Sequence, residues 1–392
     1  MFSFGPLAFH VLGKTNLNNG FQHSIVISAL RGLAAVQVLA AHLRAQLFPG
    51  LSTLSDPSYW YQALAFFTGF AHQAVVVFFL LSGWLVGGSL LNRMHEPGIM
   101  LNYAIDRITR LWIVLIPCFV ITLTVALYIG EADASRVSFS PKGEYSIAAF
   151  VGNLFGLQDM VVPRYGGNFA LWSLANETWY YVLFPLLVLP HLYKRPVAML
   201  AALAALAVIV HLLSFRIVLY SAIWLLGVVA SRVRIEAGRG VRTAFVLVLV
   251  ALSVYFRITG SNDILTEKSF VQDCVFSVAF LVFLSSQQFP ADQARMGTRL
   301  AAKLGNLLAP FSFTLYVIHV PLLVLLRHLY APLRAGHLSP GHIADLLVYG
   351  AFFTVILVLA YALYWPFEAQ TPKLRKLLKR TWATWGKPAG AA

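Results

Sequence analysis

Ten apolar stretches recur along this chain, and each is close to the length that a helix needs to cross a membrane. Crossing about 30 Å of hydrocarbon takes about 20 helical residues. The stretches cover residues 26–47, 64–90, 109–130, 171–191, 196–215, 217–232, 242–258, 269–288, 305–326 and 343–366. The sequence therefore predicts an all-α, polytopic membrane bundle with about ten transmembrane helices.

The scarcity of charged residues favours the same fold class. Only 11% of the 392 residues are charged and 59% are hydrophobic, whereas a soluble domain carries about 25% charged residues. The net charge of +14 could indicate a nucleic-acid partner. In a membrane protein, however, Lys and Arg gather in the cytoplasmic loops and keep these loops on that side. We therefore expect membrane lipid around the chain and no nucleic-acid partner. The two cysteines lie in apolar stretches, so we also expect no metal site.

The distribution of basic residues predicts the orientation in the membrane. With the N-terminus in the cytoplasm, most Lys and Arg fall in cytoplasmic loops, among them Arg239, Arg242 and Arg295, while the external loop at 49–62 has none. The positive-inside rule thus favours both termini in the cytoplasm. The longest external segment, residues 131–170, is long enough to shape a binding site.

Ionisable side chains at membrane depth are costly, so each marks a candidate functional position. The first apolar stretch carries Arg31 and His42, eleven residues apart. At about 100° and 1.5 Å per residue, the two lie on one helix face and about 16 Å apart. A cation at the cytoplasmic mouth with an imidazole beyond it suits a path for an anionic donor. A snorkelling arginine and a hydrogen-bonded core histidine are the structural alternative.

Two other apolar stretches carry charged candidates. Arg107 and Arg110 share a face at a cytoplasmic helix end and suit phosphate oxygens, with simple positive-inside anchoring as the alternative. Glu177 lies about 8 Å below the outer interface by helical rise, at a depth that can match His42. A carboxylate beside an imidazole favours general-base chemistry. An ion pair with Arg44 is the alternative for Glu177.

Four further residues are weaker candidates for substrate contact or structure. His319 lies near the middle of the ninth stretch, with Tyr316 three residues before it. His72 is expected near the outer surface. Ser82 could carry an acyl group, but no base lies beside it in the sequence, and its small neighbours favour close helix packing.

These motifs together resemble the acyltransferase-3 family of membrane acyltransferases, and the resemblance extends from about residue 24 to residue 380. It rests on five motifs in order. These are Leu30-Arg31-Gly32 with His42, Phe78-Phe79-x-Leu81-Ser82-Gly83, the Arg-x-x-Arg of Arg107 and Arg110, Trp172-Ser173-Leu174 with Glu177, and Ser312-Phe313-Thr314-Leu315-Tyr316 with His319 and Pro321.

The resemblance implies an O-acetyltransferase of the bacterial inner membrane. Such enzymes move an acyl group, usually acetyl, from cytoplasmic acyl-CoA to a hydroxyl of an extracytoplasmic or lipid-linked glycan, as in O-antigen, exopolysaccharide and Nod-factor acetylation. It implies His42, Glu177 and Arg31 as catalytic residues, with Glu177 orienting His42. It further implies acetyl-CoA as donor, facing Arg107 and Arg110.

The resemblance also sets the expected domains: a cytoplasmic segment over 1–24, an acyltransferase-3-like transmembrane domain over 25–367 and a basic cytoplasmic tail over 368–392. The chain departs from the family pattern at Ser28-Ala29, where Asp-Gly is frequent, and at Val76, where Asp is frequent. Some relatives carry a hydrolase-like relay domain after the last span. We expect any such relay to be a separate protein here.

A transporter or flippase of an acylated or glycosylated lipid is the main rival, because it too needs charges at midplane. Such proteins normally show repeated halves and broken helices, and neither is evident in the sequence. A sensory membrane protein is a third class, without an appended signalling domain to support it. The residue pattern therefore favours the enzyme.

Overall fold

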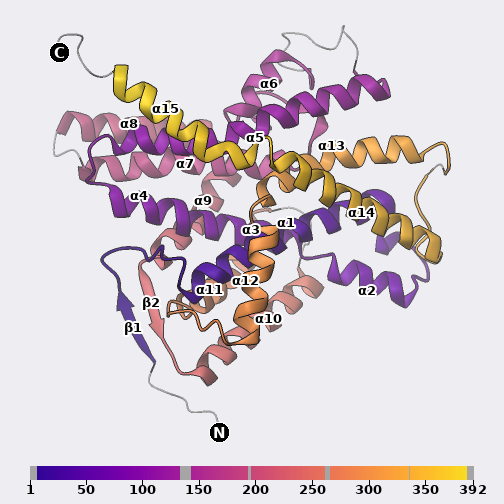
Figure 1. Cartoon of the computed structure of the whole chain (residues 1–392), viewed down its shortest axis with the longest axis horizontal. Helices are drawn as coiled ribbons and strands as arrows, with labels where there is room; N and C mark the ends of the chain where they lie inside the picture. Colours follow the sequence, from indigo (N-terminus) through magenta and orange to yellow (C-terminus); the bar gives the residue numbers. More distant parts are fainter. Residues whose placement is uncertain (1–6, 133–142, 193–195, 261–264, 335, 386–392) are drawn as a thin grey trace. The chain divides into compact units, whose positions relative to one another are not determined.

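The computed structural model (Figure 1) describes residues 7–132, 143–192, 196–260, 265–334 and 336–385. The chain divides into two compact units. Unit 1 consists of Met1–Asn92, Val208–Ser312 and Ala331–Val355. Unit 2 consists of Arg93–Ala207, Phe313–Tyr330 and Ile356–Ala392. Residues 133–142 of the long external segment, and 1–6 of the predicted N-terminal segment, lie outside the described residues.

Helices form at the predicted apolar stretches. Unit 1 contains α1 (Gln22–Leu47), α2 (Tyr59–Phe67), α3 (Ala71–Ser82), α9 (Phe215–Ala230), α10 (Arg239–Thr259), α11 (Phe270–Ser285), α12 (Met296–Leu308) and most of α4 (Gly88–Arg93). Unit 2 contains α5 (Ile99–Ile129), α6 (Ile147–Leu154), α7 (Leu171–Leu192), α15 (Thr371–Trp385) and nearly all of α13 (Ser312–Tyr330). Helices α8 (Pro196–Leu212) and α14 (Ile343–Tyr364) contribute residues to both.

Two predicted stretches are not continuous helices. The second, 64–90, is divided between α2, which ends at Phe67, and α3, which begins at Ala71. The ninth is 305–326. It is divided between α12, which ends at Leu308, and α13, which begins at Ser312. Pro310 lies in the break, where its missing N–H and its steric effect on the preceding residue disfavour helix. The all-α bundle is therefore confirmed with these two stretches corrected.

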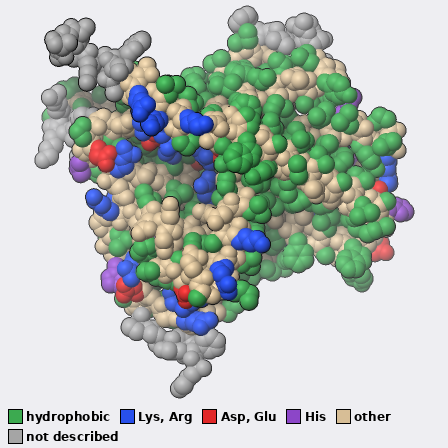
Figure 2. Space-filling model, viewed as in Figure 1, with side chains coloured by type: hydrophobic (Ala, Val, Ile, Leu, Met, Phe, Trp, Pro, Cys, Tyr) green, Lys and Arg blue, Asp and Glu red, His purple; other side chains and the backbone are tan. Residues whose placement is uncertain are grey.

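Six helical segments among the described residues are long and apolar enough to cross a membrane, and α8, α9 and α11 are shorter apolar helices. The apolar window of α10 has no buried residue. Hydrophobic side chains cover much of the visible surface (Figure 2), as expected where lipid replaces water as solvent. A helical membrane bundle is thus confirmed, while the number of crossings and the location of the termini stay predictions.

Close helix contacts in unit 1 depend on glycine. A β-carbon on Gly32 would overlap the side chain of Leu308, so α1 and α12 approach closely only because that carbon is absent. Gly83 begins a π-helical segment, Gly83–Gly87, and a β-carbon there would overlap the carbonyl oxygen of Trp224 on α9. Small residues allow such approach between membrane helices.

Two further elements were not predicted. Strand β1 (Ala8–Val11) pairs antiparallel with β2 (Val233–Glu236) in unit 1, so the all-α prediction omitted a short ribbon. In unit 2 the predicted basic tail forms helix α15, which packs on α5. Asp106 of α5 holds it by ion pairs with Arg375 Nε at 3.0 Å and Lys379 Nζ at 2.6 Å.

Candidate functional site

Arg31 and His42 both lie on α1 in unit 1. This helix runs without a break from Gln22 to Leu47, so the geometry on which their shared face was predicted applies. Both side chains are half-buried. Gly32, next to Arg31, is a contact point for α12. The motif around Arg31 therefore combines a charged group with a packing position.

Ser82 has a structural role in unit 1. Its hydroxyl accepts a hydrogen bond from Trp224 Nε1 at 3.1 Å, and Trp224 is fully buried. Gly83 contacts the backbone of the same tryptophan. Buried indole N–H groups usually find an acceptor, so the Ser82-Gly83 motif provides both an acceptor and room for α9. Packing, the favoured alternative for Ser82, agrees with this geometry.

His72 belongs to a buried polar cluster that the sequence did not reveal. Its Nε2 lies 2.6 Å from Asp273 Oδ1, and both side chains are almost fully buried. Tyr220 donates its hydroxyl proton to the second oxygen, Asp273 Oδ2, at 2.6 Å. The three residues come from α3, α11 and α9. Asp273 was missed although an acid within an apolar stretch is itself a signal of function.

Asp273 orients the imidazole of His72 within this cluster. An ionised carboxylate only accepts hydrogen bonds, so the Nε2 of His72 carries a proton toward Asp273. The Nδ1 of His72 is buried and has no hydrogen-bond partner among the described residues.

Arg110 is paired with an acid that was not predicted. Within unit 2, its Nη1 donates to Glu368 Oε1 at 2.6 Å, and the Glu368 side chain is buried. The other carboxylate oxygen accepts from Thr314 N at 3.0 Å and Thr314 Oγ1 at 2.7 Å. Glu368 therefore neutralises Arg110 and also satisfies a backbone donor in the first turn of α13.

Arg107 has different surroundings in the same unit. Its guanidinium carbon lies 5.7 Å from the ring centre of Tyr103 and 5.5 Å from that of Tyr181. The Tyr181 hydroxyl donates to Glu177 Oε1. The Nε of Arg107 is buried without a hydrogen-bond partner among the described residues. Arg107 and Glu177, predicted separately, thus both contact Tyr181.

Tyr316 connects two of the motifs on which the family resemblance rests. Its hydroxyl is hydrogen-bonded to Ser173 Oγ at 2.5 Å, which connects α13 to α7 within unit 2. His319, one turn further along α13, is completely buried, with Nδ1 3.2 Å from the carbonyl oxygen of Leu315. Both residues are therefore parts of the helix core.

The described portion of the segment predicted to be external, residues 131–170, is well structured. Asn153 of α6 donates to the carbonyl oxygen of Pro163 at 2.9 Å and accepts from Tyr165 N at 3.1 Å. The Tyr165 ring packs 4.9 Å from Phe119 of α5. Burial raises the pKa of Tyr165, because the phenolate loses solvation. The segment thus has the order that a binding surface requires, although its role stays a prediction.

The two units contain different parts of the predicted site. Arg31, His42, His72 and Ser82 belong to unit 1. Unit 2 contains the others, which are Arg107, Arg110, Glu177, Tyr316 and His319. The prediction that Glu177 orients His42 stays a prediction, as does an ion pair of Glu177 with Arg44.

The chain belongs to the acyltransferase-3 family: residues 25–365 match its acyltransferase domain. The match covers most of the 392 residues and confirms the resemblance found in the sequence. No curated protein and no solved structure matches the chain. With its apolar helices, the chain is thereby a multi-pass membrane protein of an acyltransferase family.

Proposed function

We propose that the protein is a transmembrane O-acyltransferase. It moves an acyl group, acetyl in the simplest case, from cytoplasmic acyl-CoA to a hydroxyl of an extracytoplasmic or lipid-linked glycan, in a bacterial inner membrane with both termini in the cytoplasm. The family match over residues 25–365 carries this proposal. The buried, charged residues on its helices support it, because such residues in a membrane mark paths and reaction sites.

Donor binding is assigned to Arg107. Its guanidinium keeps a buried Nε without a partner among the described residues, and arginine forks suit phosphate oxygens. Arg110, also expected to face the donor, already has a carboxylate partner in Glu368. We therefore give Arg110 an indirect role, in which its bond to Glu368 ties α5 to the carboxylate that accepts from Thr314 at the start of α13.

His42 is proposed as the general base, with Arg31 on the same face guiding the donor. The acceptor hydroxyl gives its proton to His42 while its oxygen attacks the thioester carbonyl. The new C–O bond forms, the C–S bond breaks, and the CoA thiolate takes up the proton from the imidazole. A positioned base contributes about 10²–10⁴-fold in rate. Glu177, which accepts a hydrogen bond from Tyr181, is proposed as a second catalytic residue.

The test uses purified protein in liposomes with radiolabelled acetyl-CoA and membrane glycan as acceptor. We expect His42→Ala to lose glycan ester formation by about 10²-fold or more while eluting as a folded protein. The matched control is His95→Ala, because His95 is exposed and should retain full activity. Wild-type ester levels in His42→Ala would remove His42 from the mechanism. Glycan flipping without acyl-CoA consumption would favour the transporter instead.

A further inference from the structure

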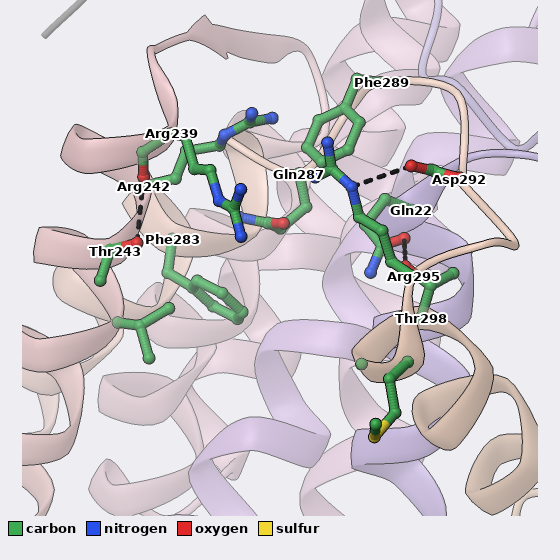
Figure 3. A pocket seen from close by; sticks show the side chains of 13 residues that line it. Gln22, Arg239, Arg242, Thr243, Phe283, Gln287, Phe289, Asp292, Arg295 and Thr298 are labelled. Carbon is green, nitrogen blue, oxygen red and sulfur yellow. Dashed lines mark hydrogen bonds and ion pairs between the residues drawn. The ribbon is translucent and has the colours of Figure 1, made fainter. Parts of the chain in front are cut away.

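A cavity of about 590 Å³ lies in unit 1 at the start of α10. It is lined by charged, polar and apolar side chains from α1, α10, α11 and the segment leading into α12. Figure 3 shows the α10 arginines, Arg239 and Arg242, on one side and Arg295 on the other. We call this cavity the arginine pocket. It contains none of the residues assigned above to acyl transfer.

The arginine pocket carries an excess of positive charge. Asp292 is the acid among its lining residues, and it is paired with Arg295 Nε at 2.9 Å. Arg239 and Arg242 form no ion pair with any residue in the described parts of the chain. Gathering such cations around one cavity is unfavourable by Coulomb's law unless an anion or solvent compensates. Two guanidinium groups are thus available to an anionic ligand.

The geometry of the lining favours an anion with several oxygens. The Arg242 guanidinium carbon lies 4.2 Å from the ring centre of Phe289, so the ring fixes its position. Gln287, whose Nε2 already donates one proton to Ser286 Oγ, adds a second amide proton beside the arginines. Guanidinium groups bind phosphate oxygens bidentately, with higher strength than neutral donors. The arrangement therefore matches a phosphate group better than a single carboxylate.

The position of the pocket indicates which molecule brings the phosphate. Helix α10 has no buried residue in its apolar window, so this helix offers an apolar surface suited to lipid tails. Val246, one turn beyond Arg242, lines the pocket and is 39% exposed. Apolar surface of α10 thus continues from the pocket along the helix. Basic pockets at the cytoplasmic side of membrane helices bind anionic headgroups.

We propose that the arginine pocket is a binding site for a phosphate ester, held by Arg239 and Arg242. An anionic phospholipid brings this group along the α10 surface, and the phosphorylated nucleotide end of acyl-CoA is the other source of the same chemistry. The inference does not rest on the proposed function, because binding is measured without acyl transfer.

The experiment measures binding by purified protein in neutral detergent. Short-chain phosphatidylglycerol is the lipid probe, short-chain phosphatidylcholine its neutral counterpart, and adenosine 3′,5′-bisphosphate the nucleotide probe. We expect Arg239→Gln/Arg242→Gln to weaken phosphatidylglycerol binding by about tenfold or more, the effect of losing a charge-assisted hydrogen bond. The matched control is Arg299→Gln, which removes an exposed arginine outside the pocket and should bind as wild type.

Each outcome has a defined meaning. Selective loss of phosphatidylglycerol binding identifies the lipid as the source, and loss of bisphosphate binding identifies the nucleotide; both support a phosphate site. Equal affinities of wild type, control and double variant for both charged probes would overturn it. Should the Gln variant fail to fold, Arg239→Lys/Arg242→Lys keeps the charge and loses the fork. Its affinity should then fall between wild type and complete loss, and an unchanged affinity would count against the proposal.

Discussion

The pair of Arg110 and Glu368 gives the sharpest test of how charge is used in this protein. The two residues are 258 positions apart in sequence, and Arg110 Nη1 donates to Glu368 Oε1 at 2.6 Å. Glu368→Ala removes this bond together with both bonds from Thr314. It leaves an arginine without its counter-ion and a backbone N–H without its acceptor. We therefore expect a marked loss of stability.

The magnitude follows from burial. Removing one partner of a buried ion pair costs about 3–5 kcal/mol. The Glu368 side chain is 1% exposed and Arg110 is 28% exposed, so the stranded guanidinium retains some solvation. We expect Glu368→Ala to lower the free energy of unfolding by about 3 kcal/mol, near the lower end of that range. Glu368→Gln keeps the shape and loses the charge, and should cost about 2 kcal/mol.

The assay is a double-mutant cycle on Arg110→Gln and Glu368→Gln, with unfolding followed by detergent titration in mixed micelles. Contacting charged residues show coupling energies of about 0.5–3 kcal/mol, and we expect about 2 kcal/mol here. Glu96→Gln is the matched control. It breaks an exposed pair with Arg93, so it should cost under about 1 kcal/mol.

The same cycle separates a structural Arg110 from one that binds the donor. If Arg110 is structural, Arg110→Gln lowers stability, and adding Glu368→Gln costs little more because the buried charge is gone. If it binds phosphate, the folded single variant shows a higher KM for acyl-CoA, as expected for Arg107→Gln. A coupling energy near zero together with a raised KM would refute our reasoning about this pair.

Three further predictions concern contacts in the helices. Gly83→Ala should lower the apparent melting temperature by several degrees, because the added β-carbon would overlap the Trp224 carbonyl oxygen. Such overpacking costs about 1–3 kcal/mol, and an unchanged melting temperature would contradict the close approach. Asp273→Asn should destabilise by about 1–3 kcal/mol, since it alters the buried bond to His72, as detergent unfolding will measure. Asp106→Asn should increase proteolytic release of α15, as its ion pairs with that helix are lost; wild-type cleavage rates would contradict this.

The sequence predicts the helices better than it predicts their partners. Apolar length located the helices because a membrane helix satisfies its own backbone hydrogen bonds, so its extent depends on local composition. The break at Pro310 was missed because apolar content continues across it. The ribbon of β1 and β2 joins strands more than 220 positions apart, and neither strand is long enough to produce a clear alternating pattern.

Ion pairs are harder still, since position along the chain carries no information about distant partners. Glu368 lies in the predicted tail, and Asp273 lies in an apolar stretch. Neither has a basic neighbour in the sequence that identifies its ion-pair partner. Their partners were both candidates, Arg110 for binding the donor and His72, more weakly, for substrate contact or structure. A systematic count of every acid within or beside an apolar stretch would have identified both carboxylates, because each is costly there without a partner.

Two arginines of the same motif, Arg107 and Arg110, have different surroundings, so the motif alone does not define their roles. Arg107 and Arg110 lie one turn apart on α5, and the resemblance assigns them the same role. One is neutralised by a buried glutamate, and the other lies against two aromatic rings with a buried donor unused among the described residues. A guanidinium that already has its carboxylate must lose that bond before it binds phosphate, and this cost weakens its affinity. We therefore expect Arg107→Gln to raise the KM for acyl-CoA more than Arg110→Gln does. Equal increases would contradict the different roles assigned to the two arginines.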